Sequence, residues 1–226
     1  RQARMQILLT NDDGIYAPGI QILYGALCSA HQVTVIAPDR ERSAVGHGIT
    51  LHQPLRANQV AVNAHYSGYA INGTPADCVK LGIYEILSQR PDLVISGINP
   101  GANVGINVNY SGTVAAAREA TILGCRAIAI SQYIARDRQI DWAATGYHAR
   151  PVLQMLLSRD LAHGHFWNVN LPHPHGTDIE LSYAFCDLDT HPHQYIYDQQ
   201  GDALIYKGTI HERPRDAGKD VAVCFD

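Results

Sequence analysis

Short apolar runs alternate with segments of helical periodicity along most of the chain. Residues 6–9 form a first apolar run, residues 18–30 repeat apolar side chains at helical spacing, and residues 33–37 form a second run. A strand, a helix and a strand in close succession are typical of a βαβ unit with parallel strands. Because such strands are apolar on both faces, the alternation predicts an α/β fold with helices on either side of a mainly parallel sheet.

The same alternation continues beyond this unit. Pro151 lies inside a further helical segment, where it predicts a break or a kink. Residues 51–71 alternate apolar and polar side chains instead, which predicts a hairpin or two short strands. The remaining expected elements are helices at residues 75–87, 112–123 and 142–157 and strands at residues 93–96, 127–130 and 166–170.

The C-terminal part of the chain has a different composition. After residue 187 it is rich in His, Asp, Gln, Gly and Pro, and two apolar triplets, at residues 195–197 and 204–206, flank a turn-like segment. We interpret this pattern as an exposed β-hairpin, and such an arm often packs on a partner subunit because it has no core of its own. The predicted domains are therefore an α/β core at residues 5–186 and an arm at residues 187–226.

Charge and cysteine usage limit the class of protein. The formal net charge is -4, so no global basic field favours duplex nucleic acid or an anionic membrane, and any phosphate must be recognised locally. The 5 cysteines are widely spaced without a C-x-x-C pair, which favours reduced thiols and a cytoplasmic location. No segment approaches the length of a membrane span. We expect Met5 to be the natural first residue.

Two adjacent carboxylates, Asp12 and Asp13, directly follow the first apolar run, and Gly14 can adopt the positive φ of a sharp turn. Ligands of parallel sheets gather beyond the carboxyl ends of the strands. Ser43 and Asn99 lie in two other strand-end loops, and this all-oxygen set suits magnesium, manganese or calcium rather than zinc. The alternative, from the aspartates alone, is that Asp13 caps a helix and Asp12 is a solvated turn residue.

Ser111, Gly112 and Thr113 lead directly into an Ala-rich helix. Free backbone N–H groups and two hydroxyls at a helix N-terminus form a natural anion site, so we expect a phosphate there. Simple N-capping by Ser111 or Thr113 is the alternative, and it is compatible with phosphate binding.

The loop at residues 96–105 carries glycine at every fourth position, which lets backbone approach a ligand closely. It matches neither the dinucleotide fingerprint nor a P-loop, and a tight loop with glycines for its turns is the alternative. Most of the 12 histidines are interpreted as loop or surface residues, whereas His47, in another strand-end loop, is a candidate substrate contact.

Several motifs occur in a fixed order over residues 6–131. They are Ile-Leu-Leu-Thr-Asn-Asp-Asp-Gly at residues 7–14 with Ala-Pro-Gly-Ile at 17–20, Ala-Pro-Asp-Arg at 37–40 with Arg-Ser at 42–43, Gly-Thr-Pro-Ala-Asp-Cys-Val at 73–79, Pro-Asp-Leu-Val-Ile-Ser-Gly-Ile-Asn at 91–99 and Tyr-Ser-Gly-Thr-Val at 110–114. Together they resemble the SurE survival-protein family of 5'/3'-nucleotidases.

The resemblance implies a Rossmann-like three-layer core and hydrolysis of nucleoside 5'- and 3'-monophosphates, with short polyphosphate as a further substrate of some members. It implies one divalent cation per subunit, Mg, Mn or similar, held by Asp12, Asp13, Ser43 and Asn99. It also implies homodimers or homotetramers formed through exchanged C-terminal arms. We expect phosphate and substrate contacts from Asn11, Asn103, Ser111, Gly112 and Thr113.

The chain departs from the family pattern in a few places. Ala44 stands where many members have glycine, and Arg118 stands where some have an apolar residue. The chain ends at Asp226, where relatives continue into another strand and a tail, so we expect the arm to be C-terminally incomplete.

The expected mechanism uses the cation to polarise a phosphoryl oxygen and activate water, and either Asp12 or Asp13 to accept the proton of that water. A broad acid phosphatase or exopolyphosphatase without nucleotide preference is one alternative. A nucleotide-binding module without catalysis is the other, although two carboxylates beside a phosphate repel it unless a cation lies between them.

Overall fold

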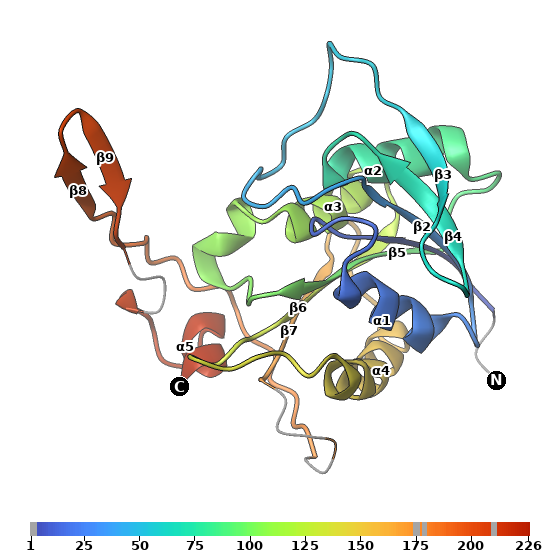
Figure 1. Ribbon diagram of the computed structural model, residues 1–226. Helices are drawn as coiled ribbons and strands as arrows, with labels where there is room; N and C mark the ends of the chain where they lie inside the picture. Colours follow the sequence, from blue (N-terminus) through green and yellow to red (C-terminus); the bar gives the residue numbers. More distant parts are fainter. Residues whose placement is uncertain (1–3, 174–176, 178–179, 209–211) are drawn as a thin grey trace.

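The computed structural model describes residues 4–173, 177, 180–208 and 212–226. A seven-stranded sheet with the strand order β3-β4-β2-β1-β5-β6-β7 forms its centre (Figure 1). All neighbouring pairs are parallel except β3 with β4. The strands are β1 (Gln6–Thr10), β2 (Gln32–Pro38), β3 (Ala57–Ala61), β4 (Ser67–Ile71), β5 (Leu93–Pro100), β6 (Arg126–Gln132) and β7 (Trp167–Leu171).

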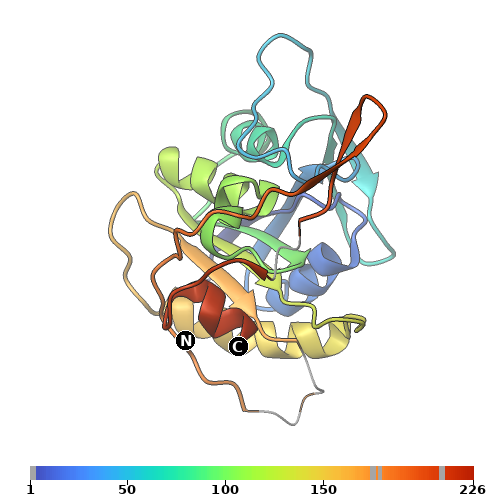
Figure 2. The ribbon, with the colours of Figure 1, turned by 90° about the vertical axis from the view of Figure 1, so that its left-hand side faces the viewer.

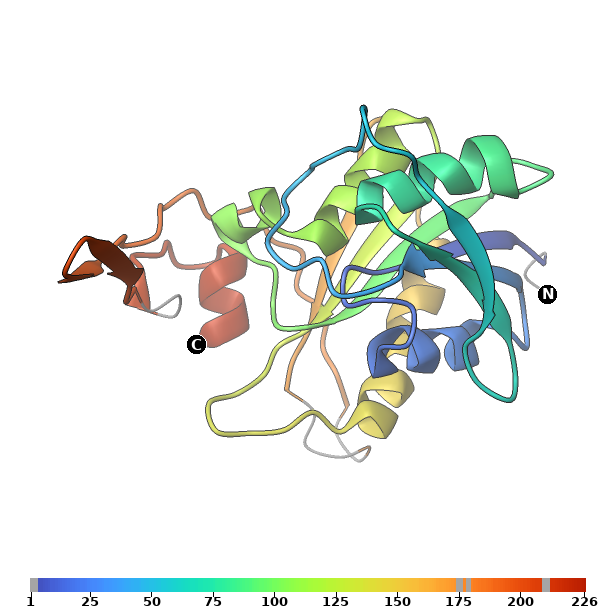
Figure 3. The same ribbon diagram turned by 45° about the horizontal axis from the view of Figure 1, so that its top comes forward.

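Helices cover both faces of the sheet, which confirms the predicted three-layer α/β architecture. On one face α1 (Pro18–Leu27) packs beside α4 (Trp142–Leu157), and on the other α2 (Pro75–Leu81) packs beside α3 (Gly112–Ile122), as Figures 1 and 3 show. Successive side chains of a strand point to opposite faces, so Leu8 and Leu9 are both fully buried in different cores.

The strand order creates a switch point between β1 and β5. The chain passes from β1 to β2 on one side, and later returns to the other side of β1 as β5. The loops that follow β1 and β5 therefore diverge at their carboxyl ends, and this is where open α/β sheets bind ligands.

Two predicted helices differ in detail from the structure. The helix expected at residues 75–87 ends as an α-helix at Leu81 and continues as a π-helical turn, η1 (Gly82–Ile86). Gly82 lies so close to the sheet that a Cβ there would be 2.3 Å from Leu8 Cδ1. Of the predicted break or kink at Pro151, the break is wrong, because α4 runs through this residue, and the kink stays a prediction.

The C-terminal segment contains the predicted hairpin, formed by β8 (Tyr197–Gln200) and β9 (Ala203–Tyr206). All residues of these two strands are exposed, and the hairpin projects from the body of the molecule in Figure 1, toward the viewer in Figure 2. Helix α5 (Asp220–Phe225) returns to the body, where Asp220 Oδ2 accepts a hydrogen bond of 2.6 Å from Gly105 N in η2 (Gly105–Asn109). A domain boundary at residue 187 stays a prediction.

Among the residues that the structure describes, no helix combines the length and apolar character needed to cross a membrane.

Candidate active site

The turn that follows β1 is shaped by Asn11. Its Nδ2 donates to Gly14 O at 2.8 Å, and Gly14 N donates back to Asn11 Oδ1 at 3.2 Å. Gly14 has a φ of 101°, which a residue with a side chain rarely adopts. Asn11 is fully buried and serves this turn, which presents Asp12 and Asp13 at the strand end.

Asp12 lies directly against the N-terminus of α3. It is only 5% exposed, and its Oδ1 accepts a short hydrogen bond from Thr113 Oγ1. A Cβ placed on Gly112 would be 2.9 Å from Asp12 Cβ, so only glycine allows this approach. The structure therefore brings the aspartate pair and the predicted phosphate turn together, although they are about 100 residues apart.

Ser111 is the N-cap of α3. Its Oγ accepts a hydrogen bond of 3.1 Å from Val114 N, and it is 8% exposed. The capping role that the sequence left open is thus present. A phosphate at this end of α3 would then be bound mainly by the backbone N–H groups of Gly112 and Thr113.

The loop after β2 closes over the turn from the other side. Arg42 N donates to Asp12 O at 2.7 Å, and Ser43 Oγ donates to Glu41 Oε1 at 2.6 Å. This loop also carries a third carboxylate, Glu41, whose charge is among the causes that raise the pKa of both aspartates.

The far part of this loop contacts α3 and the turn before it through Gly46 and His47. Gly46 N donates to Tyr110 O at 3.0 Å, and His47 Nε2 lies 2.7 Å from Glu119 Oε2. The His47 side chain is 23% exposed and that of Glu119 is 12% exposed. His47, expected as a candidate substrate contact, therefore has a hydrogen-bond partner in the fold itself.

The carboxylates at this strand end are poorly compensated. Burial, and then the charges of Asp12 and Glu41, raise the pKa of Asp13 from 3.8 to about 7. Burial also raises the pKa of Asp12, against hydrogen bonds from Thr113 that lower it. Asp13 Oδ2 is buried without a hydrogen-bond partner among the described residues. A hard cation fits this orphaned oxygen and relieves the repulsion between the carboxylates.

Asn99 lies across the switch point from the aspartates. Thr10 of β1 pairs with Ser96 of β5, and the regular register of β5 with β6 is interrupted between Ser96 and Asn99. Asn99 Nδ2 donates to Gly101 O at 2.7 Å, which orients the side chain with Oδ1 as its remaining acceptor. The strand order thus places an amide oxygen at the same edge of the sheet as Asp12 and Asp13.

Asn103 is 8% exposed and is held by β6 and β7. Both of its nitrogens donate hydrogen bonds within the fold. The backbone N donates to Asn170 Oδ1 at 2.8 Å, and Nδ2 donates to Ser131 Oγ at 2.9 Å. Its O accepts from Asn168 Nδ2 at 2.7 Å. These contacts make Asn103 an anchor of the glycine-rich loop; a direct contact with phosphate stays a prediction.

Glu41 is the site residue that the sequence analysis did not identify. Its signal is present in the sequence, because it lies two positions before Ser43 in the loop that follows β2. The contact itself depends on the path of an irregular loop, which periodicity does not predict.

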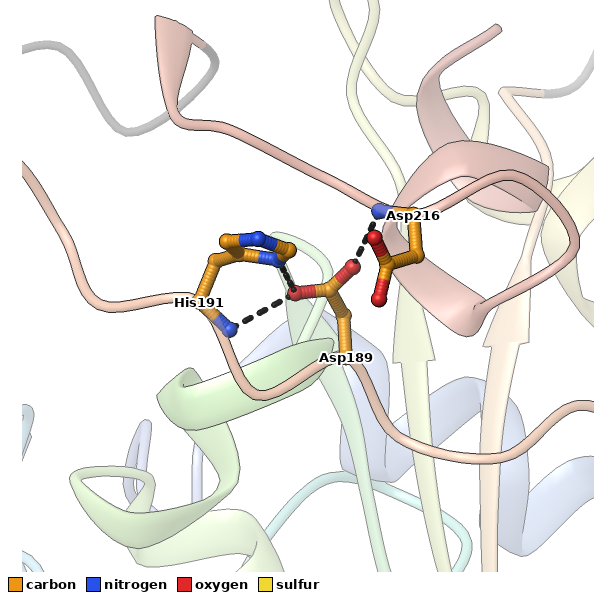
Figure 4. A group of neighbouring side chains, drawn as sticks. All are labelled: Asp189, His191 and Asp216. Carbon is orange, nitrogen blue, oxygen red and sulfur yellow. Dashed lines mark hydrogen bonds and ion pairs between the residues drawn. The ribbon is translucent and has the colours of Figure 1, made fainter.

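A second cluster of potential metal ligands, Asp189, His191 and Asp216, lies in the C-terminal segment (Figure 4). Asp189 Oδ1 accepts from His191 N at 2.8 Å and from His191 Nδ1 at 2.9 Å, and Asp189 Oδ2 accepts from Asp216 N at 2.8 Å. Burial opposes ionisation, but these groups outweigh it and lower the pKa of Asp189 to about 2. Both carboxylate oxygens of Asp189 accept hydrogen bonds from N–H groups, so the cluster is explained by its structural role in holding these segments together.

Residues 7–193 match the profile of a family described as Survival protein SurE. The chain is 51% identical to 5'-nucleotidase SurE of Desulfatibacillum aliphaticivorans over 74% of its own length and 66% of that relative. It is 41% identical to 5'-nucleotidase SurE of Heliobacterium modesticaldum over 96% of its length and 81% of that relative. The crystal structure of the SurE protein from Aquifex aeolicus superposes with a TM-score of 0.80 at 32% identity, over 97% of this chain and 88% of that one. The chain belongs to the SurE survival-protein family.

Proposed function

We propose that the chain is a divalent-metal-dependent phosphomonoesterase that hydrolyses nucleoside 5'-monophosphates, and 3'-monophosphates, to nucleoside and phosphate. The observation that carries this proposal is the contact of the aspartate turn with the N-terminus of α3, where Thr113 Oγ1 donates to Asp12 Oδ1 and Asp13 Oδ2 is buried without a partner among the described residues. The names of the relatives, 5'-nucleotidase SurE, support the substrate class.

The proposed metal ligands are Asp12, Asp13, Ser43 and Asn99, with one divalent cation per subunit. They supply carboxylate, hydroxyl and amide oxygens, which favour magnesium or manganese. When bound, the cation supplies positive charge that polarises a phosphoryl oxygen and lowers the pKa of adjacent water.

The N-terminus of α3 binds the phosphate in this proposal. Backbone N–H groups of Gly112 and Thr113 donate to its oxygens, and the helix dipole stabilises its charge. Ser111 holds this turn by capping α3. Asn11 and Asn103 support the substrate through the turn after β1 and the glycine-rich loop, which they shape.

An aspartate accepts the proton of the attacking water. Asp12 Oδ1 already accepts a hydrogen bond from Thr113, whereas Asp13 Oδ2 has no partner among the described residues. This difference leaves Asp13 Oδ2 for the cation and makes Asp12 the more fixed ligand.

Phosphate release tests the proposed function. The chelator-treated protein is assayed with Mg, Mn or EDTA on AMP, GMP, 3'-AMP, p-nitrophenyl phosphate and polyphosphate. We expect metal-dependent release, fastest with nucleoside monophosphates, and its loss in Asp12→Asn, while Asp160→Asn, an exposed aspartate, keeps full activity. Equal rates on all esters would indicate a broad phosphatase. Binding of AMP without any release would indicate a nucleotide-binding module.

A homodimer or homotetramer is the proposed assembly. One observation supports it: all residues of the strands β8 and β9 are exposed, and large apolar side chains are among them. Just before the hairpin, Tyr195 Oη lies 3.1 Å from Tyr110 Oη. Isolated two-stranded hairpins are marginally stable in water, so a partner surface would stabilise this one. The exposed large side chains are Tyr195, Ile196, Tyr197, Leu204, Ile205 and Tyr206.

A cytoplasmic location is part of the proposal. All 5 cysteines are free thiols in the structure, as a reducing compartment would keep them.

A further inference from the structure

Glu41 and Ser43 flank Arg42, whose backbone connects the loop after β2 to the aspartate turn. Arg42 N donates to Asp12 O at 2.7 Å, and the two neighbouring side chains meet, because Ser43 Oγ donates to Glu41 Oε1 at 2.6 Å. The backbone bond at Arg42 fixes this Glu-Ser pair beside Asp12.

The hydrogen bond from Ser43 to Glu41 determines which part of the Ser43 hydroxyl is available to bind a cation. A hydroxyl has one hydrogen and two acceptor lone pairs. Since the hydrogen points to Glu41, the lone pairs of Ser43 Oγ point away from it and can bind a cation. A hydroxyl that rotates freely would offer a hydrogen to the cation as readily as a lone pair.

The negative charge of Glu41 is available to the site. The guanidinium of Arg42, its immediate neighbour, lies 3.0 Å from Asn72 O and 3.5 Å from Asp39 Oδ1. The charge of Glu41 is among the causes that raise the pKa of Asp12 and Asp13. Both Glu41 and Ser43 are exposed, where a single hydrogen bond adds little to folding stability.

We propose that Glu41 is a positioning residue, which accepts the hydrogen bond of the Ser43 hydroxyl and thereby orients the oxygen lone pairs of Ser43 toward the cation held by Asp12 and Asp13. This inference rests on the proposed metal-dependent function. Partners of metal ligands fix the orientation of the ligand and raise its basicity. Glu41 does so for Ser43 through the hydrogen bond between their side chains.

The test measures cation binding directly, without substrate. Mn²⁺ is titrated calorimetrically into chelator-treated wild-type protein, E41A, E41Q, S43A and the double variant E41A/S43A. Loss of such a partner typically weakens metal binding roughly 10–100-fold, which we expect for E41A. E41Q keeps a neutral acceptor for Ser43 and should lose less than E41A. Glu85→Ala, an exposed glutamate in η1, is the matched control and should bind as wild type.

The double variant separates orientation from simple charge attraction. If Glu41 acts through Ser43, E41A/S43A binds Mn²⁺ more tightly than the product of the two single losses predicts. Additive losses, or wild-type affinity in E41A, overturn the inference while the proposed function stands. A wild-type protein that binds no Mn²⁺ overturns both. Because both residues are exposed, circular dichroism should report an intact fold in every variant.

Discussion

At the residue scale, the protonation of Asp13 determines how the charge of the site changes with pH. Burial and the neighbouring carboxylates raise its folded pKa from 3.8 to about 7. Between these two values the folded chain binds a proton that the unfolded chain releases. Stability without metal therefore falls as pH rises through this window.

This sign gives a prediction for thermal unfolding. With EDTA, the Tm should decrease as pH rises from about 4 to about 7, in the range set by the raised pKa. Mn²⁺ should reduce this decrease, because the cation stabilises the ionised carboxylates. Asp13→Asn should flatten the profile without metal. An unchanged slope in this variant would show that Asp13 is not the responsible group.

Part of the site could be predicted from the types of residue at the strand ends and at the start of a helix. The aspartate pair and the helix N-terminus at Gly112 follow from strand-end and capping patterns, and the structure brings them together. Glu41 was missed because its role depends on a side-chain contact inside an irregular loop. The φ of 55° at Ala44 explains in physical terms why a glycine suits that position, a conformation that only coordinates reveal.

At the element scale, the N-terminus of α3 requires a glycine. A Cβ on Gly112 would lie 2.9 Å from Asp12 Cβ and 3.2 Å from Asp12 Oδ2. Gly112→Ala should displace α3 or Asp12 and lower kcat/KM at least ~10-fold, a change of about 1.4 kcal/mol in barrier. Gly25→Ala, in α1 with open space around it, should instead raise stability by about 0.5–1 kcal/mol with unchanged kinetics. Similar kinetics in both variants would contradict the close approach of α3.

The loop after β2 is fastened to α3 by the pair of His47 and Glu119. Glu119→Gln should loosen this loop, so amide hydrogen exchange at residues 44–49 should accelerate and cation affinity should fall, since ligands on loops depend on their supports. Far-UV circular dichroism should not change. Unaltered exchange in the loop would indicate that the pair is dispensable for its position.

The order of strands and helices was predictable because buried strands and amphipathic helices differ in period. The end of α2 was not, because the helix continues as a π-helical turn at the point where Gly82 lies close to Leu8, and these two residues are far apart in sequence. Pro151 shows the reverse case: tertiary packing of α4 on α1 maintains a helix that local chemistry disfavours.

At the scale of the whole molecule, the order of the strands determines where the site residues lie. The alternation of elements predicted a parallel sheet, but it did not specify that β5 pairs with β1. That pairing creates the switch point where Asn99, Asp12 and the N-terminus of α3 share one edge. The arm was predictable from composition, whereas its anchoring through Asp220 and Gly105 is a contact between distant segments.

The hairpin gives a prediction for assembly. Replacing Leu204 and Tyr197 by aspartate should place charges on its exposed apolar surface and shift light-scattering mass toward the monomer, because interface cores exclude unpaired charge. Asp198→Asn and Asp202→Asn, in the same hairpin, should leave the mass unchanged. A wild-type protein that is monomeric at high concentration would contradict the proposed role of the arm.

The most direct measurement of the central claim is phosphate release from AMP as Mn²⁺ is titrated into chelator-treated protein, for wild type beside Asp13→Asn. The account predicts no release before the metal is added, saturating activation with about one Mn²⁺ per wild-type chain, and no activation of the variant. Full turnover in the presence of EDTA, or equal activation of Asp13→Asn, would contradict it.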